Sequence, residues 1–140
     1  MDFVKAFIAG FVSTLVFHQG VLTLFYLAGA FPRVPYDLTA VPPLGIPAVI
    51  SLAFWGGIWG AAIWPLLKHA GGVAYWLRAL VMGAIGPSAV ALLIVFPLKG
   101  MPIAGGGDPK LIVGALVLNG AWGLGMALLM RLMTGVGTIR

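Results

Sequence analysis

Residues 45–67 read GIPAVISLAFWGGIWGAAIWPLL and contain no charged side chain. A helix needs about 20 apolar residues to cross the ~30 Å hydrocarbon layer of a bilayer. Three further uncharged apolar runs lie near residues 6–31, 79–98 and 111–130. The four runs together predict an all-α, polytopic membrane protein with four transmembrane helices.

The composition supports the same class independently of the runs. Hydrophobic residues make up 61% of the chain and charged residues 8%, against roughly 25% charged in a soluble domain. The mean hydropathy of +1.11 and the 21 glycines are typical of packed transmembrane helices. The net charge of +5 comes from scattered basic residues that form no stripe, which argues against nucleic-acid binding. The absence of cysteine excludes disulfides and Cys-ligated metals.

Polar and proline-rich breaks divide a single domain, residues 1–140, into four spans. We expect these spans at about 5–31, 45–68, 75–98 and 110–133. The first break holds several prolines and predicts an extended loop. The second, Lys68 to Gly72, is typical of a helix end followed by a tight antiparallel return. The first run exceeds the length of a signal-peptide core, so we expect it to remain as a span.

The basic residues near the span ends indicate an orientation. Five of them are expected on one side of the membrane and three on the other: Lys5, Lys68, Arg78, Arg131 and Arg140 against Arg33, Lys99 and Lys110. Cytoplasmic ends carry the excess of Lys and Arg. This bias predicts an up-down bundle in a cell inner membrane with both termini in the cytoplasm.

The two halves of the chain resemble each other. Residues 5–12 match residues 78–85, and the Gly57 to Gly60 segment matches Gly120 to Gly123. Units of two spans each begin on the same side of the membrane, which gives a parallel repeat. The pattern predicts two similar helical hairpins, residues 1–70 and 71–140, although chance similarity in a chain this rich in small residues is the alternative.

Small residues are expected to form the helix contacts. Helices associate in lipid by close packing, which small residues allow. Gly56, Gly57 and Gly60 lie on one face of the second span, and Gly123 lies on the equivalent face of the fourth. These glycines predict packing seams, either within the chain or between copies of it.

A layer of polar and helix-perturbing groups is expected at half depth. Counting 1.5 Å per residue from the span ends brings Trp55, Gly86 and Pro87 to the midplane, together with the six side chains of the expected polar cluster: His18, Gln19, Trp59, Ser88, Asn119 and Trp122. Two interpretations stay open. The groups satisfy one another within a packed bundle, or they line a small polar pocket or solute path.

His18 is the residue in this layer on which a cofactor could depend. Haem or pigment binding would need a second axial ligand from elsewhere, because His69 lies at the membrane edge. No second His, Asp or Glu lies at membrane depth to complete a zinc site. We therefore predict no cofactor and no metal, with His18-bound haem or pigment as the alternative.

Enzyme chemistry has few residues to use. The only acids are Asp2, Asp37 and Asp108, all outside the spans, and there is no Glu. We therefore predict a small non-enzymatic integral membrane protein that acts through helix packing, as a homo-oligomer or an accessory subunit of a larger membrane complex. Its partners would be lipids and other membrane helices. A channel or transporter for an ion or small polar solute, with its path at the cluster around His18, is the alternative.

Overall fold

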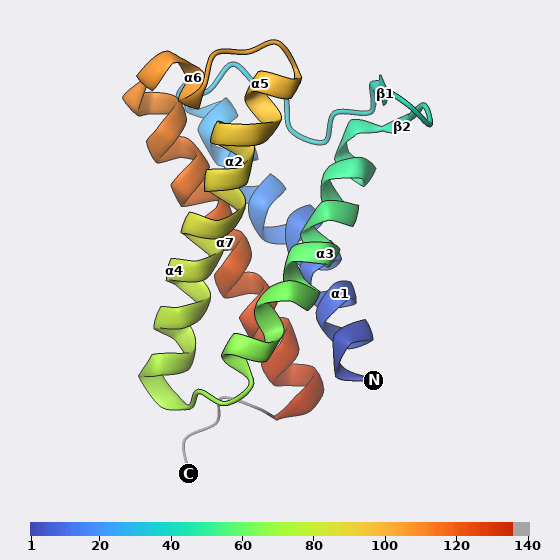
Figure 1. Ribbon diagram of the computed structural model, residues 1–140, viewed down its shortest axis with the longest axis vertical. Coiled ribbons are helices and arrows are strands. Elements are labelled where there is room, and N and C mark those ends of the chain that lie inside the picture. The colour runs from blue at the N-terminus through green and yellow to red at the C-terminus, as the bar shows by residue number, and fades with distance from the viewer. Residues whose placement is uncertain (136–140) are drawn as a thin grey trace.

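The computed structural model describes residues 1–135 of the chain. It is mostly helical, and four helices in this part are long and apolar enough to cross a membrane (Figure 1). They comprise Asp2–Leu27, Ala48–Leu67, Gly72–Leu98 and Pro109–Thr134. The expectation of a helical chain with four such segments is confirmed.

Two of the four long helices contain a short π-helical segment. The first consists of α1 (Asp2–Ser13), η1 (Thr14–His18) and α2 (Gln19–Leu27). The third consists of α4 (Gly72–Val90), η2 (Ala91–Val95) and α5 (Phe96–Leu98). The other two are unbroken, α3 (Ala48–Leu67) and α7 (Pro109–Thr134). A π-helical turn widens the helix locally and often marks a functional position.

The first spanning helix ends four residues earlier than the predicted boundary at residue 31. Gly29 adopts a left-handed backbone, with φ +71°. The N–H of Ala30 donates to the Phe25 carbonyl at 2.8 Å, and the N–H of Gly29 donates to the Tyr26 carbonyl at 3.0 Å. This is the hydrogen-bond pattern of a Schellman cap, which satisfies the last carbonyls of the helix and stops it.

The first loop contains a small hairpin that the sequence did not predict. Strand β1 (Ala40–Val41) pairs antiparallel with β2 (Ile46–Pro47), with Ala40 opposite Pro47. The peptide bond between Pro42 and Pro43 in the connecting turn is cis. The third break holds a short turn, α6 (Ala104–Gly107), in which Gly105 and Gly106 have left-handed backbone angles. Figure 1 shows both of these connections at the end of the molecule opposite the α3–α4 turn.

Close helix contacts occur at two crossings. Helix α1 packs on α3, α4 packs on α7, and α7 also contacts α1 (Figure 1). In the first crossing, a Cβ added to Gly60 would collide with the Ala6 carbonyl. In the second, a Cβ added to Gly123 would collide with the Ala79 carbonyl, and one added to Gly83 would lie 2.7 Å from the Gly123 Cα. Backbones approach this closely only where glycine supplies no side chain.

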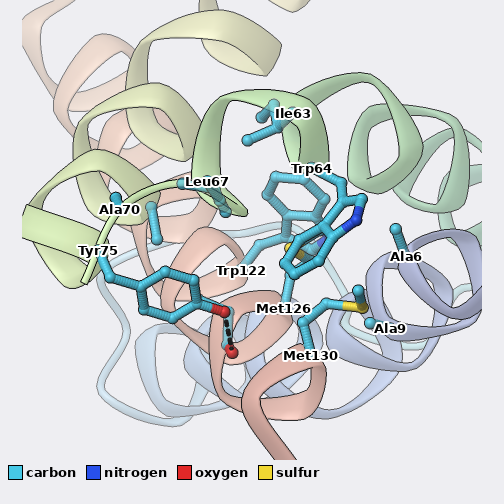
Figure 2. Close-up of a cluster of buried hydrophobic side chains, with 12 residues drawn as sticks. Ala6, Ala9, Ile63, Trp64, Leu67, Ala70, Tyr75, Trp122, Met126 and Met130 are labelled. Atoms are coloured by element: carbon cyan, nitrogen blue, oxygen red, sulfur yellow. Dashed lines mark hydrogen bonds between the residues drawn. The ribbon is translucent and has the colours of Figure 1, made fainter. Parts of the chain in front are cut away.

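A cluster of buried large side chains lies near the end where α1 begins and α3 turns into α4. Figure 2 shows Trp64, Tyr75, Trp122, Met126 and Met130 packed together there. The Tyr75 hydroxyl donates to the Ala127 carbonyl at 2.7 Å. Among the described residues, Trp64 Nε1 is buried without a hydrogen-bond acceptor. The core therefore joins all four long helices at one end of the bundle.

Candidate functional site

The first group of polar contacts within the spanning helices joins α1 to α7. The Ser13 hydroxyl donates to the Trp122 carbonyl at 2.6 Å, and Trp122 Nε1 donates to the Gly10 carbonyl at 2.9 Å. The Thr14 hydroxyl donates to the same Gly10 carbonyl at 3.0 Å. Ser13, Thr14 and Trp122 are all buried. The Ser13 and Trp122 side chains therefore hold one helix against another, whereas Thr14 bonds within its own helix.

The second group joins α4 to α7. Asn119 Nδ2 donates to the Ser88 hydroxyl at 3.0 Å, and Ser88 is buried. Ser88 follows Pro87, which lies inside the helix and has no N–H to donate. Trp59, on α3, packs against α4 nearby, since a Cβ added to Gly86 would lie 3.1 Å from its ring. Four of the six side chains expected at half depth thus lie in contacts between helices.

The third group surrounds η1 and connects it to the first loop. Gln19 Nε2 lies 3.3 Å from His18 Nδ1, and Gln19 Oε1 accepts a 2.7 Å hydrogen bond from the Tyr36 backbone N–H. The Tyr36 hydroxyl donates to the Leu15 carbonyl within η1 at 2.7 Å. Tyr36 has a left-handed backbone, with φ +52°, which is uncommon for a residue with a side chain. The loop thus folds back onto the helix and holds it at two points.

A small cavity of about 10 Å³ lies between this loop and the helices. Its polar lining comes from Gln19, Arg33 and Asp37, and the rest is apolar. A volume of this size holds about one water molecule. The cavity can therefore hydrate the loop contacts, and it is too small for an organic solute.

The acidic residue of the first loop, Asp37, accepts hydrogen bonds from Thr39. The hydroxyl and the backbone N–H of Thr39, followed by the positive charge of Arg33, lower the pKa of the Asp37 carboxyl below its ordinary value of 3.8. The bond from the Thr39 N–H is 2.9 Å long. Asp37 is exposed, so this arrangement shapes the loop rather than a buried site.

The expected midplane layer does not form one cluster. Within residues 1–135, no hydrogen bond joins His18 or Gln19 to Ser88 or Asn119. Ser88 contacts Asn119, Trp122 contacts α1, and His18 and Gln19 contact each other and the loop. No pattern in the sequence predicts that Tyr36, in the proline-rich loop, reaches η1.

The four glycines expected at helix contacts all lie against a neighbouring helix. Gly56 faces Thr14 of η1, Gly60 faces Ala6 of α1, and an added Cβ on Gly57 would lie 2.6 Å from the Phe7 ring. Gly123 faces Ala79 of α4. These contacts lie within one chain, so the glycine faces are already occupied.

Helix α3 has a second face that is largely exposed on the surface of the molecule. It carries four residues, which we call the α3 seam: Ser51, Trp55, Ile58 and Ala62. Trp55 is 58% exposed and Ile58 is 41% exposed. In the part of the chain that the structure describes, neither the Ser51 hydroxyl nor Trp55 Nε1 has a hydrogen-bond partner. Trp55 is the eighth residue of a 20-residue helix, about 4 Å from its centre at 1.5 Å per residue.

The titratable residues offer no metal centre in the described chain, where no group of three His, Asp or Glu side chains comes together. The features of the structure from which a function can be proposed are the interhelical hydrogen bonds, the loop contacts at Gln19 and the exposed α3 seam. No protein family, curated protein or solved structure was found to match the chain.

Proposed function

We propose that this chain is a non-enzymatic integral membrane protein that acts through helix packing, as a subunit of a homo-oligomer or of a larger membrane complex. The observation that carries the proposal is the exposed indole of Trp55, a hydrogen-bond donor at membrane depth with no acceptor in the described chain. Lipid tails cannot accept a hydrogen bond, and tryptophan is normally enriched at the membrane interface instead. A neighbouring helix would supply the missing acceptor.

The other polar side chains in the spans support the same proposal. Ser13, Ser88, Asn119 and Trp122 each bond to another helix of the same chain. Interhelical hydrogen bonds in membranes are worth about 0.6 to 2 kcal/mol each. Groups used in this way stabilise the bundle, and they are not free to bind a passing solute.

We further propose that the bundle is an up-down arrangement of two similar hairpins, residues 1–70 and 71–140. The contact of Gly60 with Ala6 has a counterpart in the contact of Gly123 with Ala79, at the positions that the sequence match pairs. Residues 136–140 of the second unit lie outside the described chain. Equivalent crossings in both halves favour a duplicated hairpin over chance similarity.

We propose that the protein lies in a cell inner membrane with both termini in the cytoplasm. The two ends of the bundle differ in formal charge, with Lys5, Lys68, Arg78 and Arg131 at one and Arg33, Lys99 and Lys110 at the other. Arg140, which was counted with the first group, lies outside the described residues. Arg78 donates to the Leu66 carbonyl at 3.2 Å, and Arg131 lies 5.7 Å from the centre of the Trp76 ring. An excess of Lys and Arg is typical of the cytoplasmic side, and tryptophan is enriched at both membrane interfaces.

A path for an ion or small polar solute near His18 is the second candidate. The cavity beside Gln19, the residue that follows His18, favours it, because Gln19, Arg33 and Asp37 give it polar walls and its volume of about 10 Å³ holds about one water molecule. Flux of ions and small polar solutes into liposomes should then fall on His18→Leu. An unchanged flux in the variant would eliminate this candidate.

The proposed assembly is tested by extracting the protein from its host membrane in a mild detergent. Light scattering coupled to size exclusion gives the protein mass of the particle, and mass spectrometry identifies any proteins that co-purify. We expect a particle heavier than one 14.6 kDa chain, from added copies or from other membrane proteins. A monomer without partners would contradict the proposal.

A further inference from the structure

We infer that the α3 seam binds a second copy of this chain, in a two-fold symmetric dimer in which Trp55 of each copy donates to Ser51 of the other. This inference rests on the proposed function, since it names the partner in the assembly. It begins from the spacing of Ser51, Trp55, Ile58 and Ala62, which alternates between four and three residues. That 3.5-residue repeat is the seam of two helices in a left-handed coil.

The seam lies on the side of α3 that faces away from its own chain. The buried side of α3 includes Val49, Ala53 and Gly60. Three of the seam residues, Ser51, Trp55 and Ala62, each lie two positions after one of these buried residues. Two residues correspond to about 200° around an α-helix. Helix α3 can therefore contact α1 with one side and another molecule with the opposite side.

The chemistry of the seam is complementary to itself. Trp55 supplies an N–H donor and a large ring, and Ser51 supplies an acceptor oxygen and a small side chain, one helical turn away. Copies inserted in the same direction are related by an axis along the membrane normal, so their α3 helices run parallel. Trp55 then lies about 6 Å along the axis from the partner's Ser51, at 1.5 Å per residue. An indole can span that distance, and the same contact forms twice.

A lipid or an unrelated helix explains the seam less well. Lipid tails offer no acceptor for the indole. An unrelated partner would need its own acceptor at the correct depth, whereas a second copy brings Ser51 to the correct depth automatically. In this parallel arrangement Trp55 faces Trp55 of the second copy, and each ring must extend one helical turn along the axis to reach the small Ser51 side chain of the other copy.

Single-cysteine cross-linking tests the inferred face directly, because the chain has no native cysteine. We would introduce Ile58→Cys and Ala62→Cys in the seam and, as controls, Val81→Cys on α4 and Val117→Cys on α7, which are also exposed. A disulfide forms only where the two Cα atoms come within about 7 Å. Oxidation in native membranes should give a covalent dimer at the two seam positions and none at the controls.

The hydrogen bond is tested by the dissociation constant of the dimer in lipid vesicles. Trp55→Phe keeps an aromatic ring and removes the donor, so the two reciprocal bonds are lost together. We expect dimerisation about tenfold weaker, as two bonds of this type would give. Trp76→Phe is the control, because Trp76 lies on α4 and outside the α3 seam. This variant should leave the dissociation constant of the dimer unchanged.

Each contrary result has a separate meaning. Cross-links at the control positions alone would overturn the α3 seam and leave the proposed assembly standing. Cross-links from the seam to a different protein would overturn the second copy as partner, again leaving the assembly. A dimer that Trp55→Phe does not weaken would overturn the reciprocal hydrogen bond. A monomer with no cross-link and no partner would overturn both this inference and the proposed function.

Discussion

Trp122 Nε1 donates a 2.9 Å hydrogen bond to the carbonyl of Gly10, a residue at the other end of the chain. The contact joins α7 to α1, and the Ser13 hydroxyl returns a second bond to the Trp122 carbonyl. Glycine at position 10 also lets α3 approach, because an added Cβ would collide with the Gly56 carbonyl. One short segment of α1 thus connects the first and second halves of the bundle.

The Trp122 bond should be measurable against a matched tryptophan. Trp122→Phe removes a satisfied donor, whereas Trp64→Phe removes a buried N–H that has no acceptor in the described chain. Both variants lose similar ring volume. We expect Trp122→Phe to lower the free energy of unfolding by about 1 kcal/mol more than Trp64→Phe. Unfolding in mixed micelles with increasing SDS measures the difference, and equal losses would show that the bond contributes nothing.

The glycines at the two helix crossings should be equally intolerant of a methyl group. Gly60→Ala and Gly123→Ala each place a Cβ against a backbone carbonyl of the neighbouring helix, so the helices must separate. Overpacking of this kind costs about 1 to 3 kcal/mol. Gly20→Ala is the control, because nothing lies within 4 Å of its added Cβ. Thermal unfolding in detergent should rank the control nearest to the wild type, and two very different losses at Gly60 and Gly123 would argue against equivalent hairpins.

The contact between Tyr36 and η1 should protect the first loop from proteolysis. Tyr36→Phe removes the hydrogen bond to the Leu15 carbonyl and leaves the ring in place. A hydrogen bond of about 0.5 to 1.5 kcal/mol corresponds to roughly a two- to tenfold change in loop opening. Trypsin should therefore cleave after Arg33 that much faster. Tyr26→Phe, on the exposed side of α2, is the control, and cleavage rates that stay equal would remove the role assigned to Tyr36.

The turn at Asp37 should depend on pH only in the acidic range. Its carboxyl has a pKa below the ordinary 3.8 because Thr39 donates hydrogen bonds to it and Arg33 lies nearby. The charged form therefore stabilises the folded loop, fully above pH 3.8, and this contribution is lost as the pH falls through the lowered pKa. Thr39→Val removes the hydroxyl and should raise the pKa of Asp37 toward 3.8. Carboxyl-carbon NMR in nanodiscs measures both values, and an identical pKa in the two proteins would contradict this explanation.

The sequence predicts the helices well because their signal is long and local. An uncharged run such as residues 45–67 leaves few alternatives to a spanning helix, and the glycine spacing identifies Gly56, Gly60 and Gly123 as close to other helices. The ends of the helices are predicted less exactly than their existence. The first helix stops at Leu27 because Gly29 forms a left-handed cap inside an apolar segment, where hydropathy alone suggests continuation.

The polar contacts were harder to predict because they depend on helix rotation and on one long-range loop. Depth alone groups His18 with Asn119, but their side chains bond to different neighbours once the helices are packed. Tyr36 reaches Gln19 through an unusual backbone angle, and no local pattern marks it. The π-helical turn at Thr14–His18 likewise has no sequence signature in this chain.

Subunit counting in a lipid bilayer tests the central claim most directly. The protein, labelled once per chain outside the spans, would be reconstituted at low density and counted by stepwise photobleaching of single particles. Assembly through the α3 seam predicts mostly two steps per particle for the wild type and a shift toward one step for Trp55→Phe. The account would be contradicted if wild-type particles bleached in one step at every density and no other protein co-purified with the chain from its native membrane.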